Sequence, residues 1–93
     1  MAVTAQTKQR RSLKYIRLAA FLASQPATDT LLELSLQEIE DLVGEALPPN
    51  SRFPSWWRND ERRMHARAWM TAGWLVTDAL AEEGIVRFER AKV

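Results

Sequence analysis

Hydrophobic residues recur at helical spacing in the first of three amphipathic segments, residues 12–24. The stripe expected to face the core consists of Leu13, Ile16, Ala20 and Ala23, widened by Tyr15, Leu18 and Leu22. Polar side chains keep only a narrow strip, at Lys14 and Arg17. A helix that is apolar around most of its circumference is either central to the core or shared with a partner chain, so this segment suggests a dimer.

Alternation of leucines with polar residues over positions 32–36 predicts one short strand. Ser35 and Glu38 have the spacing of a capping box, in which each side chain accepts from a free amide of the first helical turn. A second helix is therefore expected to run from this box to Val43 and to stop at Gly44. Its outer face is acidic and carries Glu38, Glu40 and Asp41.

The third amphipathic segment predicts a helix over Asp60–Ala72, with Asn59 or Asp60 as its N-cap. The stripe expected to be buried consists of His65, Ala68, Trp69 and Ala72. The face expected to point away from the core carries Arg63, Arg67 and Met70, with Ala66 between them. Gly73 fits the left-handed position that follows the last residue of a helix.

Three prolines among the eleven residues 45–55 exclude a helix of ordinary length between the second and third helices. We expect a structured loop instead, with its end pinned by Phe53, Trp56 and Trp57. Trp69 and Trp74 are expected in the core, because a tryptophan in a small domain usually supplies buried area.

The last part of the chain predicts a C-terminal β-hairpin. Residues 74–76 are bulky and β-prone, residues 81–84 suit a turn, and residues 85–90 alternate in polarity. The order of elements is that of a winged helix-turn-helix-like α+β fold, in which the third helix enters a DNA groove and the hairpin forms the wing. We expect residues 12–93 to form this single domain, preceded by a flexible basic arm over residues 1–11.

Composition narrows the chemistry that the chain can perform. No cysteine is present, which excludes a disulfide framework and a thiolate metal site. The lone histidine, His65, has no carboxylate at i+3 or i+4 and is expected to be packed and hydrogen-bonded rather than a metal ligand. No glycine-rich phosphate loop or nucleophile motif is found, so we expect no enzyme activity, cofactor or small-molecule substrate. No apolar run approaches the roughly 20 residues of a membrane span and no signal peptide is visible, so a cytoplasmic protein is expected.

Charge is segregated along the chain, although the net charge is only +1. Residues 1–17 carry five bases and no acid, residues 29–45 carry six acids and no base, and residues 52–67 carry five arginines and two acids. Such segregation favours a surface with one basic and one acidic side. The alternative is that the blocks pair with each other within the monomer.

The basic residues predict a surface for double-stranded DNA. Arginine can hold guanine O6 and N7, or a phosphate, with two parallel hydrogen bonds, and a helix N-terminus also favours phosphate. The expected contacts are Arg58, Arg62, Arg63 and Arg67 around the third helix, Lys8, Arg10, Arg11 and Lys14 in the arm, and Arg87 and Arg90 on the wing. A small regulator of transcription, or of phage or mobile-element biology, acting as a homodimer, is the expected setting.

A protein–protein interaction module, either an adaptor or an inhibitor, is the alternative function. It would dock through the acidic second helix or through the corner formed by Trp56 and Trp57. Two adjacent tryptophans do not easily both face inward, so one of them is a candidate for a partner surface.

Four groups of residues also resemble a family of small, uncharacterised bacterial domains. They are Leu36-Gln37-Glu38-Ile39-Glu40, Leu47-Pro48, Trp56-Trp57-Arg58-Asn59 and Ala68-Trp69-Met70-Thr71-Ala72-Gly73-Trp74-Leu75-Val76. The resemblance spans roughly residues 13–90, and the tryptophan spacing is its most specific part. It supports the winged-helix-like fold and implies no particular chemistry.

Overall fold

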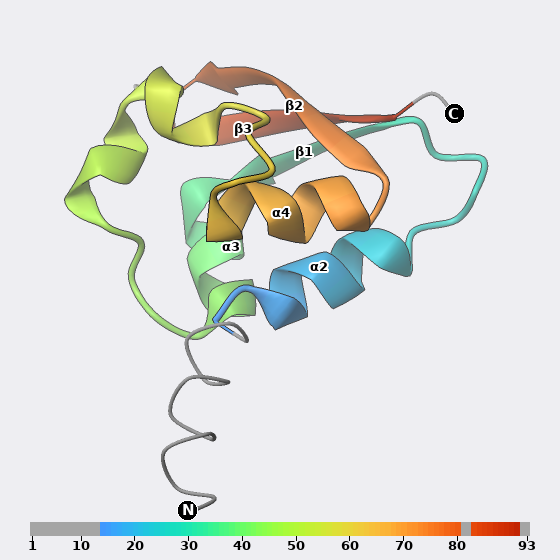
Figure 1. The fold of residues 1–93 in the computed structure, drawn as a ribbon, viewed down its shortest axis with the longest axis horizontal. Helices are drawn as coiled ribbons and strands as arrows, with labels where there is room; N and C mark the ends of the chain where they lie inside the picture. The colour runs from blue at the N-terminus through green and yellow to red at the C-terminus, as the bar shows by residue number, and fades with distance from the viewer. Residues whose placement is uncertain (1–13, 81–82, 92–93) are drawn as a thin grey trace, which may run out of the picture.

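The computed structural model describes residues 14–80 and 83–91, which place three helices on one side of an antiparallel sheet of three strands (Figure 1). The helices are α2 (Ile16–Ala23), α3 (Leu36–Val43) and α4 (Met64–Thr71). The strands are β1 (Leu31–Ser35), β2 (Trp74–Leu80) and β3 (Ile85–Arg90). Two short 3-10 helices, η1 (Pro49–Arg52) and η2 (Pro54–Trp57), lie in the loop between α3 and α4. The predicted α+β class and the C-terminal hairpin are confirmed.

β3 is the central strand, with β1 and β2 paired antiparallel on either side of it. The face toward the helices is apolar, because Leu34 lies opposite Val86 and Val76 lies opposite Phe88, and all four are buried. The other face is open to solvent. It carries Glu33, Asp78 and Glu89 around the single base Arg87 and is therefore acidic.

The core lies between the helices and the sheet and is dominated by aromatic residues. Trp69, Trp74 and Phe88 are each fully buried, as expected for the first two. The Trp74 indole Nε1 also donates to the Leu22 carbonyl oxygen at 2.9 Å. This bond connects α2 to β2. It gives the buried indole N–H a hydrogen-bond partner, while the indole rings add buried apolar area to the core.

Helix α3 begins and ends where local signals predict. The Ser35 hydroxyl accepts from the Glu38 amide at 3.0 Å, and the Glu38 carboxylate accepts from the Ser35 amide at 2.9 Å. Gly44 ends the helix with φ +91°, a conformation in which an L side chain would be strained. Gly73 has the same φ after α4, so both predicted helix ends are confirmed.

Helix α2 is rotated relative to the prediction. The side chains that face the core are Tyr15, Leu18 and Leu22, whereas Ile16, Ala20 and Ala23 are exposed. The predicted main stripe is therefore wrong, and the residues expected only to widen it form the buried face. The physical reason is size, since a tyrosine and two leucines bury more apolar area than one isoleucine and two alanines. Leu13 lies outside the described residues.

Helix α4 is shorter than the predicted Asp60–Ala72. It starts at Met64 with Arg63 at the N-cap position, and no side chain caps it. Ala66 was expected on the outer face, but it is fully buried and Met70 is partly buried. Because α4 packs against both α2 and β2, its buried arc is broader than a single stripe.

The loop between α3 and α4 is structured, but not by all three predicted anchors. Phe53 is 62% exposed, so the expectation that it pins the loop is wrong. Each α-helix within residues 14–80 and 83–91 has eight residues, and no helix there is long and apolar enough to cross a membrane.

Candidate nucleic-acid interface

Asp60 organises the turn that precedes α4. Its carboxylate accepts from the Arg62 amide at 3.1 Å and from the Arg62 guanidinium through Nε and Nη2, both at 3.0 Å. The hydrogen bonds from Arg62 lower the pKa of Asp60 to about 2. Asp60 was a candidate helix cap, but it belongs to the turn over residues 60–63 and not to the helix. The turn presents Arg62 and Arg63 at the start of α4.

The four arginines predicted around the third helix are all exposed. Three of them also contact neighbouring residues. The Arg62 side chain is 88% exposed despite its pairing with Asp60. Arg63 approaches Asp60 only to 3.8 Å, and its side chain is 53% exposed. Arg67 donates from Nε to the Glu61 carbonyl oxygen at 3.1 Å. Arg63 and Arg67 thus make single, solvent-accessible contacts that a phosphate could replace, whereas Arg62 would have to exchange its hydrogen bonds to Asp60.

Arg62 and Arg67 both line one shallow hollow, together with Glu61, Met70 and Thr71. Arg63 lies one helical turn before Arg67, on the same solvent side of α4. Arg58 is also exposed and follows the last residue of η2, Trp57. The arginine surface is therefore defined here as Arg62, Arg63 and Arg67, with Arg58 nearby in sequence.

The remaining predicted bases that the structure describes are not part of this surface. Lys14 pairs with Glu45 at 3.3 Å, and Lys8, Arg10 and Arg11 lie outside the described residues. The two hairpin arginines are engaged elsewhere. Arg87 binds the Glu33 carboxylate at 2.7 Å, and Arg90 stacks over the Trp74 ring at 4.3 Å while donating to the Pro26 and Asp29 carbonyl oxygens. A wing that binds DNA through these two arginines is therefore not supported.

Ion pairs leave the charge segregation largely intact. Within residues 14–80 and 83–91, the arginines of the basic block 52–67 pair only with Asp60 and with no residue of the acidic block 29–45. The pair of Lys14 with Glu45 joins the first basic block to the acidic one. The described part of the chain thus has a basic surface at α4, on the helical side, and an acidic sheet face on the other side.

Both tryptophans of the 56–57 pair are buried, which corrects their assignment as a partner surface. Trp56 is 6% and Trp57 is 2% exposed. The tight turn of η2 sets their rings edge to face, 4.7 Å apart. Trp57 stacks on Trp69 and donates from Nε1 to the Ser51 carbonyl oxygen at 2.7 Å. Both adjacent side chains can be buried because Trp56 packs on His65 of α4, while Trp57 packs on Trp69 and bonds to η1.

His65 is packed and hydrogen-bonded, as predicted. Its ring stacks on the Trp56 ring with centroids 3.8 Å apart and planes 1° apart, and Nε2 lies 2.7 Å from the Trp56 carbonyl oxygen. A carbonyl only accepts, so this contact requires a proton on Nε2. Burial lowers the pKa of His65, the Trp56 carbonyl opposes that shift, and the positive charge of Arg63 adds to it.

The folded domain is therefore expected to lose stability as the pH falls. The unfolded chain binds a proton at His65 near its ordinary pKa of 6.5, whereas the folded chain resists it. Below that value the unfolded state gains protons that the folded state lacks, so the melting temperature should drop between about pH 7.5 and about pH 5.5. A His65→Gln variant keeps a donor for the Trp56 carbonyl without titrating, and its melting temperature should change much less across the same range.

Asn59 was a candidate cap, but its amide has a different role. Its Oδ1 accepts from Trp69 Nε1 and from the Val76 amide, both at 2.9 Å, and its Nδ2 donates to the Val76 carbonyl oxygen at 2.9 Å. One side chain thus joins the loop, α4 and β2. Sequence reasoning missed this role, because the partners are 10 and 17 residues away.

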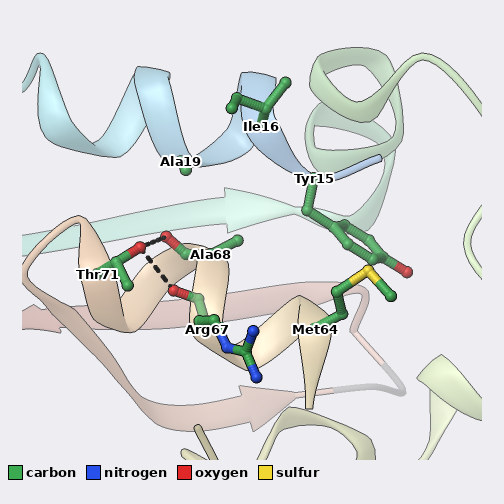
Figure 2. A pocket seen from close by; sticks show the side chains of 7 residues that line it. All are labelled: Tyr15, Ile16, Ala19, Met64, Arg67, Ala68 and Thr71. Atoms are coloured by element: carbon green, nitrogen blue, oxygen red, sulfur yellow. Dashed lines mark hydrogen bonds between the residues drawn. The ribbon is translucent and has the colours of Figure 1, made fainter. Parts of the chain in front are cut away.

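An apolar groove runs between α2 and α4 beside the arginine surface. Figure 2 shows Tyr15 and Met64 meeting at one end of the hollow, with Ala19 of α2 and Ala68 of α4 further along it. The hollow has a volume of about 190 Å³, and Ile16 also lines it. Arg67 lies at its α4 edge. Residues 14–80 and 83–91 include no cluster of side chains suited to a metal ion, so what the site offers is arginines beside an apolar hollow.

Fold and surface together define a small two-layer α+β domain with a basic surface at α4. The chain belongs to the family described as a domain of unknown function (DUF7662), which matches residues 15–91. No curated protein and no solved structure matches it.

Proposed function

We propose that the chain binds double-stranded DNA, without catalysis, through α4 and the turn before it, in the manner of a winged helix. One observation carries the proposal: Arg62, Arg63 and Arg67 extend into solvent together, while Trp69 on the other side of α4 is buried. A guanidinium group so placed can bind a phosphate or the edge of a guanine with two hydrogen bonds. Regulation of transcription is the setting that such a domain would serve.

The dimensions of α4 suit a major groove. An α-helix with its side chains is about 10–12 Å in diameter, and the major groove is about 12 Å wide. Arg63 and Arg67 are four residues apart, which is about 6 Å along the helix axis. This spacing lets one arginine contact the backbone while the next reaches a base edge or a neighbouring phosphate.

The proposal depends on the arginine surface and not on a tight helix-turn-helix. The connection between α3 and α4 occupies residues 44–63, whereas a helix-turn-helix joins its helices by three or four residues. α3 and α4 each pack on α2. In this arrangement α4 would be held against α2 and β2, and the rest of the fold would support it.

The alternative of protein docking loses support from the same contacts. The Trp56–Trp57 corner is buried. The acids of the α3 face are engaged locally, because Glu38 belongs to the capping box, Glu40 accepts from the Leu47 amide at 2.8 Å and Asp41 accepts from the Gln37 amide group at 3.0 Å. The three arginines make local contacts as well, but the Arg62 and Arg63 side chains stay 88% and 53% exposed.

A salt titration of binding to a labelled duplex tests the proposal. Each phosphate contact releases condensed counterions, and three arginine contacts imply a slope of about −2.7 when log K is plotted against log salt concentration. The arm over residues 1–11 would steepen that slope, and a variant beginning at residue 12 isolates its share. Absence of binding at about 50 mM salt would contradict the proposal and leave protein docking through α3 as the function to pursue.

A further inference from the structure

The outer side of α2 is apolar but faces solvent. Ile16 is 51% exposed, and Ala20 and Ala23 are exposed beside it. Next to this face lies a second hollow of about 300 Å³, lined by Ile16, Ala19, Ala20, Ala23, Thr71 and Ala72. It shares residues with the hollow of Figure 2, so the two form one groove between α2 and α4.

We propose that the α2 part of this groove is the interface between two copies of the chain, related by a twofold axis that crosses α2. The proposal is independent of DNA binding, because no arginine lines the second hollow. Arg67 lines only the first hollow, from α4. A twofold interface uses the same patch on both copies, so the patch must fit itself.

The shape of the face meets that requirement. The bulky Ile16 stands at the start of α2, and the small Ala20 and Ala23 lie one and two turns later, next to Ala72. When two α2 helices pack antiparallel, Ile16 of each copy comes opposite Ala23 of the other. A large side chain then fills the hollow above small ones, as helix packing of ridges into grooves requires.

Charge favours the same arrangement. The second hollow is lined by no charged side chain, so two identical copies meet there without like-charge repulsion. Arg17 is also exposed near the start of α2, but its guanidinium lies beside Gly44, the residue that ends α3, and so adds no charge to the face.

The small size of the face indicates how tightly two copies should bind. Two helices of eight residues bury less than the roughly 800 Å² per partner of a standard interface, so the dissociation constant should be micromolar. Sedimentation equilibrium on the full chain, without DNA, should show a monomer–dimer equilibrium between about 5 and about 500 µM. A monomer throughout that range would overturn the proposal.

Two substitutions locate the interface. Ala20→Glu places a charge at the centre of the face, and glutamate favours the helix, so α2 should still form. The buried charge should weaken dimerisation by at least about tenfold. Ala46→Glu makes the same change at an exposed position in the loop after α3 and should leave dimerisation unchanged. Equal dimerisation of both variants would place the contact elsewhere and overturn the proposal.

A crosslinking experiment decides the matter even if Ala20→Glu fails to fold. The chain has no cysteine, so Ala20→Cys introduces a single thiol beside the proposed axis. Under mild oxidation it should form a covalent dimer much faster than Ala46→Cys, because two copies of residue 20 would lie within disulfide reach. Equal rates for the two variants would contradict a twofold axis at α2.

Discussion

Replacing Arg63 and Arg67 together by alanine is expected to weaken duplex binding by about 100-fold, because each contact of this kind contributes about 1–3 kcal/mol. The fold should be nearly unaffected. Arg63 stands 3.8 Å from Asp60 and Arg67 donates to an exposed carbonyl oxygen, so neither loss leaves a buried group without a partner. Fluorescence anisotropy with a labelled duplex measures the affinity, and circular dichroism measures the melting temperature, which should stay within about 3 °C of the parent.

Arg52→Ala is the matched control for this double variant. Arg52 is also an exposed arginine, but it lies in η1 and outside the arginine surface, so its removal should leave the affinity nearly unchanged. Arg62→Ala should weaken binding less than Arg67→Ala, because Arg62 already binds the Asp60 carboxylate at two points. If the Arg63 and Arg67 variant instead unfolds, or binds as well as the Arg52 variant, the arginine surface is not the DNA contact.

The parts of the fold that the sequence predicts well are those set by neighbouring residues. The limits of α3 follow from Ser35, Glu38 and Gly44, whose hydrogen bonds and backbone angle involve residues only a few positions away. The end of α4 at Gly73 and the pairing of β2 with β3 are local in the same sense. Such features depend little on tertiary packing.

The misassigned features are decided by packing between distant segments. Periodicity alone cannot choose between two apolar faces of α2, and the larger side chains Leu18 and Leu22 take the core. Trp56 and Trp57 are both buried because the tight turn of η2 places Trp57 against Ser51 and Trp69, which are distant from it in sequence. The exposed arginines were predictable, since a charged side chain opposite a buried tryptophan has few alternatives to solvent.

Replacing Asn59 by alanine is expected to destabilise the domain by about 3 kcal/mol, because the hydrogen bonds of this side chain join segments that are distant in sequence. The substitution leaves three groups without a partner: the Trp69 indole N–H, the Val76 amide and the Val76 carbonyl. These groups are only partly buried, and water can reach some of them, so the loss should fall below the full cost of three buried groups. Urea denaturation followed by tryptophan fluorescence gives the free energy of unfolding.

Asn59→Asp distinguishes this network from a helix cap. Aspartate caps a helix as well as asparagine does, so a capping role predicts almost no change. In the observed network the substitution replaces the donor Nδ2 by a second oxygen, which then faces the Val76 carbonyl oxygen 2.9 Å from the position it takes. Two acceptors repel at that distance, so we expect a loss of about 2 kcal/mol at neutral pH. Asn50→Asp, at an exposed asparagine in η1, is the matched control. If Asn59→Asp is as stable as that control, the bridge between the loop, α4 and β2 does not hold the start of α4 in place.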